Sequence, residues 1–140
     1  LQSTGLASAI SDLSQPVLGI CLGMQLLFTG SDEDTADCLG IIPGQAVQFH
    51  ATDARRVPQM GWNELKIESA STLLTGVRDG GYAYFIHSYA LPVGEFTLAT
   101  ADYGAPFSAI VQKDNFFGTQ FHPERSAALG AQLLTNFLEL

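Results

Sequence analysis

Residues 16–27 form an apolar run, Pro-Val-Leu-Gly-Ile-Cys-Leu-Gly-Met-Gln-Leu-Leu, in which two glycines flank one cysteine. The pattern predicts a buried strand, a sharp turn and a helix. The spacing of Gly19, Cys21 and Gly23 is that of a nucleophile elbow, in which a tight strand-to-helix turn holds a reactive side chain clear of the sheet. This stretch therefore favours an α/β fold with Cys21 at the end of a central strand.

Two interpretations of Cys21 are open at this point. As a nucleophile, it would gain from the following helix N-terminus, which favours the thiolate. Gly19 and Gly23 would then be required, because a Cβ at either position would collide with the turn or with the neighbouring strand. As a buried strand residue, Cys21 would pack as a small apolar side chain, since cysteine is among the most buried residue types.

The rest of the chain alternates helical and extended segments. Helices are predicted over residues 1–14, 24–28 and 127–138, with Ser126 as an N-cap, and one helical turn over residues 71–74. Strands are predicted over residues 17–21, 39–42, 46–49, 64–67, 82–89, 96–103, 107–112 and 116–121, with turns at residues 43–44 and 113–115. We therefore expect one α/β domain over residues 1–140, an open three-layer mixed sheet with flanking helices.

Composition excludes several classes of partner. The chain carries 14 acidic and 6 basic residues, a net charge of −8, whereas nucleic acids and anionic membranes require clustered Lys and Arg. The acidic residues within 32–37 predict a solvated loop. Two cysteines, with no leader and no apolar run of about 18 residues, predict a cytoplasmic protein without a disulfide. Cys38 is then a small apolar filler beside residues 39–42.

Neither a metal nor a nucleotide cofactor is expected. The histidines and cysteines lack metal-ligand spacing, and no Gly-rich phosphate-binding motif occurs. His50 lies among polar residues, which predicts no specific role. His87 follows an aromatic strand, which favours a half-buried histidine with satisfied hydrogen bonds, although His87, Ser88 and Tyr89 together are also compatible with a pocket wall.

His122 is the strongest candidate for a catalytic base. It follows the predicted strand over residues 116–121, and ligand sites gather at the carboxyl edge of parallel strands. A cysteine nucleophile needs a histidine base and a third group that orients the base. Pro123 ends the strand and brings the Glu124 carboxylate within reach of the ring. The alternative is a surface His-Pro-Glu turn without a role.

The two motifs together resemble the class I (triad) glutamine amidotransferases. Residues 19–25, Gly-Ile-Cys-Leu-Gly-Met-Gln, and residues 121–124, Phe-His-Pro-Glu, occur in the family's order and about 100 residues apart. The resemblance implies a flavodoxin-like fold and the hydrolysis of glutamine to glutamate and ammonia, with no cofactor.

Three further stretches narrow the resemblance to the glutaminase subunits of imidazole glycerol phosphate synthase. They are residues 60–63 (Met-Gly-Trp-Asn), 84–89 (Tyr-Phe-Ile-His-Ser-Tyr) and 118–126 (Gly-Thr-Gln-Phe-His-Pro-Glu-Arg-Ser). The resemblance extends from about residue 16 to the C-terminus.

The resemblance implies a role for each matching residue. Cys21 is the implied nucleophile, His122 the implied base and Glu124 the group that orients His122. The backbone N–H of Leu22 is the implied oxyanion donor. The residues implied to hold glutamine are Gly23, Gln25, Ser88 and Tyr89.

A heterodimer with a (β/α)8-barrel synthase subunit is also implied, with ammonia passing across the interface to make imidazole glycerol phosphate. The implied interface residues are Met60, Trp62, Asn63, Tyr84 and Arg125. An exposed Trp is a reasonable interface anchor, although the sequence alone is equally compatible with Trp62 in the core. Two alternatives stay open: service to another synthase, such as anthranilate synthase or GMP synthetase, and an inactive fragment that only binds a partner.

The sequence departs from the family pattern in two respects. Family members begin with an apolar strand and a Gly-rich loop that supplies a second oxyanion donor, and we expect both to precede Leu1. Loss of one oxyanion donor lowers the rate on the order of 100 to 1,000-fold. Gln59 also occupies a position where many relatives carry histidine, and we expect little effect from this change.

Overall fold

The computed structural model describes residues 5–31, 38–52 and 55–140. The predicted acidic loop over residues 32–37 lies outside the described residues. Among those that are described, no helix is long and apolar enough to cross a membrane.

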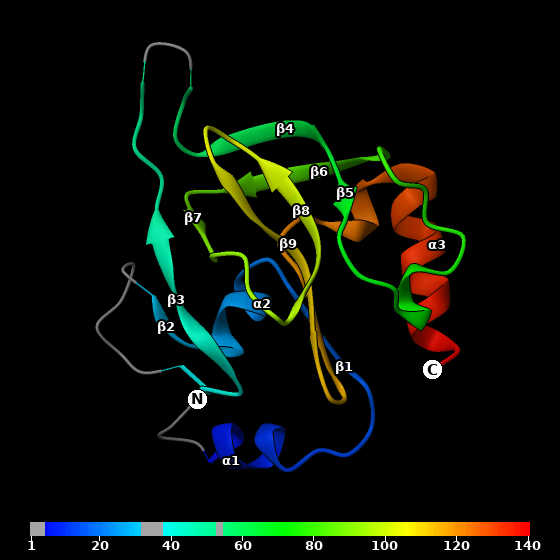
Figure 1. The fold of residues 1–140 in the computed structure, drawn as a ribbon. Helices are drawn as coiled ribbons and strands as arrows, with labels where there is room; N and C mark the ends of the chain where they lie inside the picture. Colours follow the sequence, from blue (N-terminus) through cyan, green and yellow to red (C-terminus); the bar gives the residue numbers. More distant parts are fainter. Residues whose placement is uncertain (1–4, 32–37, 53–54) are drawn as a thin grey trace.

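A five-stranded mixed sheet forms the centre of the molecule (Figure 1). Its strands, in spatial order, are β1 (Val17–Ile20), β10 (Phe116–Thr119), β9 (Pro106–Lys113), β8 (Thr97–Asp102) and β5 (Lys66–Ile67). Strands β1 and β10 are parallel, whereas the other neighbours are antiparallel. The parallel pair brings the carboxyl ends of β1 and β10 to the same edge of the sheet.

In the described part of the chain, five further strands form two smaller sheets. Strand β3 (Ile42–Gln48) lies between β2 (Phe28–Ser31) and β7 (Tyr89–Ala90), and β4 (Gln59–Glu64) pairs with β6 (Tyr82–His87). The helices and helical turns are α1 (Leu6–Ser11), α2 (Leu22–Leu26), η2 (Thr72–Leu74), η3 (Pro123–Arg125) and α3 (Ala127–Leu138). Figure 1 shows the β4–β6 pair across one end of the central sheet, with α3 beside it.

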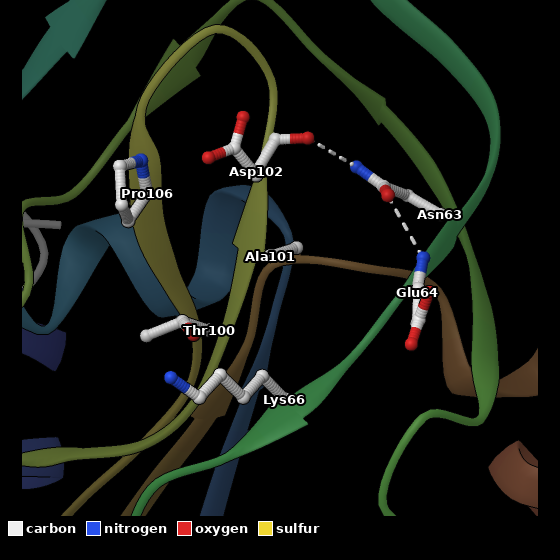
Figure 2. Close-up of a pocket in the computed structure, with 7 residues that line it drawn as sticks. All are labelled: Asn63, Glu64, Lys66, Thr100, Ala101, Asp102 and Pro106. Carbon is white, nitrogen blue, oxygen red and sulfur yellow. Dashed lines mark hydrogen bonds between the residues drawn. The ribbon is translucent and has the colours of Figure 1, made fainter.

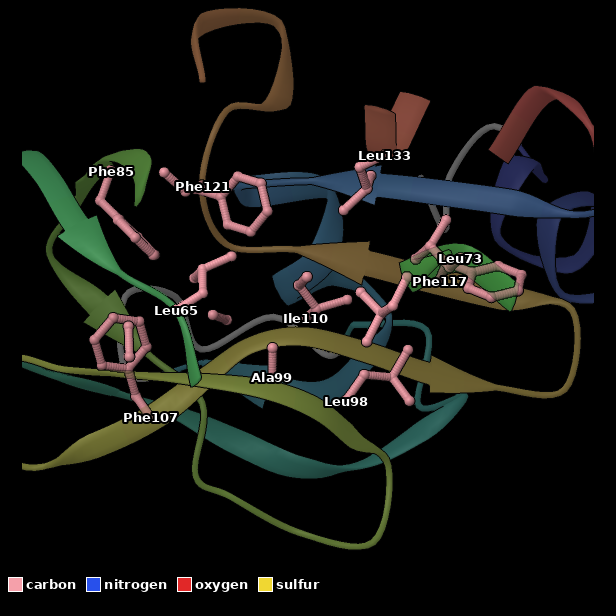
Figure 3. Packing of buried hydrophobic residues seen from close by; sticks show 14 of the residues in the cluster. Leu65, Leu73, Phe85, Leu98, Ala99, Phe107, Ile110, Phe117, Phe121 and Leu133 are labelled. Carbon is pink, nitrogen blue, oxygen red and sulfur yellow. The ribbon is translucent and has the colours of Figure 1, made fainter. Parts of the chain in front are cut away.

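Two apolar cores lie on opposite faces of the central sheet, because successive strand residues point to opposite sides. Phe117 packs in the core that contains Leu133 of α3 (Figure 3). Its neighbour Phe116 packs in the core that contains Met24 of α2. The sheet is thus covered by α3 on one face and α2 on the other, which confirms the predicted three layers.

Several predicted elements are confirmed with small changes of boundary. The final helix, the turn at residues 113–115 and the strands β8, β9 and β10 lie where the pattern placed them. The first helix is shorter than predicted, Leu6–Ser11. The segment 82–89 divides at Ser88, because β6 pairs with β4 whereas β7 pairs with β3. The segment 64–67 likewise divides between β4 and β5.

The helix predicted over residues 24–28 is wrong in its placement. Helix α2 begins at Leu22 and ends at Leu26, and Phe28 begins strand β2. Phe28 is fully buried and its ring contacts Phe96 edge-on at 5.2 Å between centroids. Pairing with β3 and this distant aromatic contact decide the conformation of Phe28, and neither is visible in local periodicity.

The turn predicted at residues 43–44 is also wrong, since β3 runs through both residues. The register with β2 shifts between Phe28 and Gly30, opposite Pro43 and Gly44. A proline cannot donate a ladder hydrogen bond and is tolerated at such an irregularity. Gly44 has a φ of +152°, which a glycine adopts readily. The two residues therefore interrupt the ladder without ending the strand.

Candidate active site

Cys21 lies in the predicted strand-to-helix turn, directly after β1. Its backbone has φ +55° and ψ −107°, a conformation rare for residues other than glycine. Its N–H donates to the carbonyl of Thr119 at 2.7 Å, and its carbonyl accepts from the N–H of Gln25 at 3.2 Å. The elbow geometry is thus confirmed and fixed at both sides, by β10 and by α2.

The two glycines that flank Cys21 differ in the space available for a side chain. A Cβ on Gly19 would lie 2.5 Å from the carbonyl oxygen of Gly23, whereas a Cβ on Gly23 would meet nothing within 4 Å. The expectation that both positions exclude a side chain is therefore confirmed for Gly19 and wrong for Gly23. Only Gly19 is crowded, because the backbone of Gly23 and Met24 lies against the position that a Cβ on Gly19 would occupy.

We expect the Gly19→Ala substitution to lower the free energy of unfolding by about 2 kcal/mol, because the added methyl group must displace backbone. Gly23→Ala is the matched control, and we expect it to leave stability unchanged or raise it by up to about 1 kcal/mol, since alanine is the better helix former. Urea unfolding followed by circular dichroism measures both. Equal losses in the two variants would contradict the one-sided contact.

His122 and Glu124 lie at the same sheet edge as Cys21. Ile20 and Thr119 are paired in the parallel register, so Cys21 and His122 follow neighbouring strand ends. The Nδ1 of His122 lies 2.7 Å from Oε1 of Glu124. A carboxylate accepts the Nδ1 proton, which leaves Nε2 of the neutral ring as the basic nitrogen. The structure thus holds the His122 ring through Glu124, at the sheet edge that also carries Cys21.

The loop that carries His122 is held against β6. The N–H of His122 donates to the carbonyl of Tyr84 at 3.0 Å. The hydroxyl of Ser126 donates to the carbonyl of His122 at 2.6 Å and accepts from the N–H of Tyr84 at 2.9 Å. Ser126 is the N-cap residue of α3, as predicted, but its side chain makes no capping bond to the helix. Its hydroxyl instead fixes the loop that carries His122 against β6.

Gln25 connects the elbow to the segment of Ser88 and Tyr89. Its side chain is 4% exposed, and its Nε2 donates to the carbonyl of Tyr89 at 3.3 Å. The carbonyl of Ser88 accepts from the N–H of Phe49 at 2.9 Å, which holds that segment in place. The structure therefore brings Gln25, Tyr89 and the Cys21 elbow together. The roles proposed for them in binding glutamine stay predictions.

Leu22, the expected oxyanion donor, is the first residue of α2. The first N–H groups of a helix have no acceptor within that helix. The side chain of Leu22 is 58% exposed, so it does not shield this amide within a core. The position suits an N–H directed at a substrate oxygen.

Gln120 is a residue of the site that the sequence analysis missed. It is fully buried, its Oε1 accepts from Nε2 of Gln25 at 3.2 Å, and its Nε2 lies 3.8 Å from Sγ of Cys21. The sulfur also donates to the carbonyl of Ile86 at 3.5 Å. Gln120 lies just past the end of β10, where an apolar strand pattern gives no sign of a polar contact.

His87 is buried with both ring nitrogens bonded. Its Nδ1 lies 2.8 Å from the carbonyl oxygen of Tyr89, and its Nε2 lies 2.7 Å from the terminal amide of Gln59. Burial lowers the pKa of His87 from 6.5 to about 4; the bond to Tyr89 opposes this change, and the charge of His122 adds to it. The satisfied-histidine interpretation is confirmed. Gln59 is itself buried and is the hydrogen-bond partner of His87.

Four of the side chains expected at the interface cluster beside the loop that carries His122: Met60, Trp62 and Arg125 are exposed, and Tyr84 is half-buried. Met60 and Trp62 are 66% and 54% exposed, so the core interpretation of Trp62 is wrong. The rings of Trp62 and Tyr84 meet edge-on at 5.7 Å, and the Arg125 guanidinium lies 4.7 Å from the Tyr84 ring centre. We call these four residues the aromatic patch. Asn63 is half-buried and donates to the carbonyl of Asp102 at 2.8 Å.

A polar pocket of about 380 Å³ opens beside Asn63 (Figure 2). Its lining residues are Asn63, Glu64, Lys66, Thr100, Ala101, Asp102 and Pro106. Figure 2 shows the Asn63 amide joined to the backbone of Asp102 and Glu64. This pocket contains none of the expected triad residues.

Metal and disulfide chemistry find no support in the described part of the chain. No group of three or more His, Cys, Asp or Glu side chains could hold a metal ion there. Neither cysteine forms a disulfide. Cys38 is half-buried, and its N–H donates to the carbonyl of Thr29 at 3.2 Å.

Comparison with known proteins agrees with this geometry. The family model described as glutamine amidotransferase class-I matches residues 2–140. Imidazole glycerol phosphate synthase subunit HisH 2 of Legionella pneumophila (strain Paris) is 50% identical over 140 residues, which are all of this chain and 70% of the relative. Subunit HisH of Salmonella typhimurium (strain LT2) is 52% identical over 141 residues, 100% of this chain and 71% of the relative.

Solved structures show the same fold at much lower identity. A protein from Thermoplasma acidophilum, described as belonging to a GMP synthase, superposes with a TM-score of 0.71 at 18% identity. The superposition covers 97% of this chain and 62% of that chain. With half of its residues shared with the HisH subunits along its whole length, the chain belongs to the class-I glutamine amidotransferase family and, within it, to the HisH subunits of imidazole glycerol phosphate synthase.

Proposed function

We propose that this chain hydrolyses glutamine to glutamate and ammonia and delivers the ammonia to a (β/α)8-barrel subunit that makes imidazole glycerol phosphate in histidine biosynthesis. The observation that carries the proposal is the sheet edge itself. There, Cys21 has elbow geometry, and the His122–Glu124 pair at 2.7 Å follows the neighbouring parallel strand. An oriented base beside a nucleophile at a strand end is the arrangement that acyl transfer requires.

In the proposed reaction, Nε2 of His122 accepts the thiol proton of Cys21, and the sulfur attacks the side-chain amide carbon of glutamine. The oxyanion that forms is stabilised by the N–H of Leu22. His122 then gives the proton to the departing ammonia, which leaves a glutamyl thioester on Cys21. Water, deprotonated by His122, hydrolyses the thioester and releases glutamate and the thiol.

Substrate orientation follows from the hydrogen bonds of Gln25. Its Nε2 carries two hydrogens, and the Tyr89 carbonyl and Gln120 Oε1 accept them. Only its Oε1 is left to interact with a substrate, and a carbonyl oxygen suits the α-ammonium group of glutamine. Gln25 would therefore recognise the amino end of the substrate and not its carboxylate.

The aromatic patch supports docking of the barrel subunit close to the reaction. Arg125 is the residue next to Glu124, and Tyr84 bonds the backbone of His122. Trp, Tyr and Arg are the residue types that most often anchor protein interfaces. Docking here would cover the triad edge and give ammonia a route away from bulk water. The heterodimer and a cytoplasmic location stay predictions.

We expect Trp62→Ala to weaken binding of the barrel subunit by about 2 kcal/mol, roughly thirtyfold in Kd, as loss of an interface anchor does. Leu138→Ala is the control, because Leu138 is exposed on α3 and lies outside the aromatic patch. Isothermal titration calorimetry with the purified barrel subunit measures both. Unchanged affinity in Trp62→Ala would place the interface elsewhere.

The proposed function is tested by labelling with 6-diazo-5-oxo-norleucine, a glutamine analogue that alkylates amidotransferase nucleophiles. The full chain is incubated with the analogue, with and without the barrel subunit, and the peptide that contains Cys21 is examined by mass spectrometry. An adduct on Cys21 that glutamine suppresses is the expected result. A folded chain that forms no adduct with the barrel subunit present would identify an inactive binding fragment.

Service to another synthase is the second candidate function. Co-purification separates the two, since a chain that ignores the histidine-pathway barrel and binds an anthranilate or GMP synthase subunit would contradict the proposal. The identity of 50% to 52% with HisH subunits favours the barrel.

A further inference from the structure

Two buried side-chain amides join a backbone carbonyl to the sulfur of Cys21. The series runs from the carbonyl of Tyr89 to Nε2 of Gln25, from the same Nε2 to Oε1 of Gln120, and from Nε2 of Gln120 to Sγ of Cys21. The three distances are 3.3, 3.2 and 3.8 Å. Gln25 and Gln120 are 4% and 0% exposed, so water does not compete for these contacts.

The backbone carbonyl of Tyr89 determines which atom donates and which accepts in every hydrogen bond of this series. A backbone carbonyl only accepts hydrogen bonds, so Gln25 must present its NH₂ group to Tyr89. The same NH₂ group also faces Gln120, so the Gln120 amide must accept this hydrogen bond through its oxygen, Oε1. The amide nitrogen of Gln120 is thereby turned toward Cys21, and its N–H points at the sulfur.

We propose that Gln120 donates a hydrogen bond to the Cys21 thiolate and that the Tyr89 carbonyl, acting through Gln25, holds Gln120 in the donating orientation. The inference rests on the proposed role of Cys21 as nucleophile. A donor to the sulfur stabilises the charged form that attacks the amide carbon. It also helps to hold the sulfur in one position before substrate arrives, because the series is anchored to the Tyr89 carbonyl at one end and the sulfur at the other end bonds the Ile86 carbonyl.

The same series links substrate binding to the nucleophile. Gln25 is proposed to accept the α-ammonium group of glutamine through Oε1, while its NH₂ group holds Gln120. A substrate that engages Gln25 therefore restricts the amide that sets the orientation of Gln120. Gln120 thus acts as a positioning residue: when glutamine binds to Gln25, the Gln120 amide and the sulfur that it contacts become more restricted.

The test is the pH dependence of Cys21 alkylation by iodoacetamide in the full chain, followed by mass spectrometry of the Cys21 peptide. Cys38 provides an internal reference in the same digest. Gln120→Met keeps the length of the side chain and removes the donor, so the pH midpoint of alkylation should rise by about one unit. Gln120→Glu presents a carboxylate oxygen to the sulfur, and its midpoint should rise further.

Two more variants show whether the pH midpoint of Cys21 alkylation depends on the orientation of the Gln120 amide or only on packing around it. Gln25→Met releases the oxygen of Gln120, and the midpoint should rise by less than in Gln120→Met because the amide can still reach the sulfur in one of its orientations. Gln112→Met is the matched control: Gln112 is a half-buried glutamine on β9 that accepts from the hydroxyl of Ser71 at 2.8 Å. We expect its midpoint to equal that of the unchanged chain. Thermal unfolding of each variant verifies that it is folded.

Alkylation does not require glutamine hydrolysis, so the two proposals fail in different ways. Raised midpoints in a chain that hydrolyses no glutamine with its barrel subunit would support the Gln120 contact and contradict the proposed function. An active chain in which folded Gln120→Met and Gln120→Glu keep the original midpoint would overturn the inference and leave Gln120 a packing residue.

Discussion

We expect the His122→Gln substitution to lower the glutaminase kcat of the chain, measured with its proposed barrel subunit, by about 10⁴-fold or more. Glutamine fills a similar volume and still forms hydrogen bonds, but it cannot take the proton of Cys21 or return it to ammonia. The loss should appear in kcat and in kcat/KM together, because proton transfer occurs in the transition state and not in substrate binding. A coupled glutamate dehydrogenase assay measures both constants.

His50→Gln is the matched control, since His50 is an exposed histidine outside the site. It should retain the kcat of the unchanged chain. The double variant Cys21→Ala with His122→Gln should lose no more activity than either single variant, because residues that act as one unit are not additive. A loss of less than about tenfold in His122→Gln would remove His122 from the role of base.

We expect acid to destabilise the chain through His87. The pKa of His87 is about 4 in the folded chain, chiefly because the ring is buried, and 6.5 in the unfolded chain. Between these values the unfolded state binds more protons, so stability must rise with pH across this window. The contribution is fully present above pH 6.5 and is lost as the pH falls toward 4. It amounts to about 3 kcal/mol.

A His87→Gln variant isolates this contribution. Its free energy of unfolding, from urea titrations at several pH values between 4 and 7, should lack the part of the slope that His87 supplies. His50→Gln should keep that slope, because this exposed position lies outside the His87 site and the variant leaves His87 unchanged. Parallel stability curves for the unchanged chain and His87→Gln would show that His87 is not the group responsible.

Much of the candidate site was predictable because it depends on spacing along the chain. Gly19, Cys21 and Gly23 predict the elbow, and residues 121–124 predict a base with an orienting carboxylate at a strand end. Both motifs are local, so the backbone that they require is encoded within a few residues. The pairing at 2.7 Å between His122 and Glu124 is a contact of this local kind.

Other features depended on contacts between distant segments. Phe28 becomes a strand residue because β3 lies beside it, although its neighbours favour helix. Trp62 is exposed because β4 pairs with β6 and turns that side chain outward toward Tyr84. Ser126 occupies the N-cap position that the sequence predicts, but its hydroxyl bonds the backbone of Tyr84 and His122 instead of the helix. Local pattern contains no information about such partners.

The sequence by itself determined the chemistry at the end of β1: a cysteine in a glycine-flanked turn and a His-Pro-Glu segment with the order and spacing of the amidotransferase family. Only the tertiary structure decided which of the two glycines has no room for a side chain: Gly19 has none, whereas Gly23 does. It also decided that Gln120 reaches the sulfur. Backbone turns follow from neighbouring residues, whereas the direction of a buried amide follows from the acceptor that faces it, here the Tyr89 carbonyl beyond Gln25.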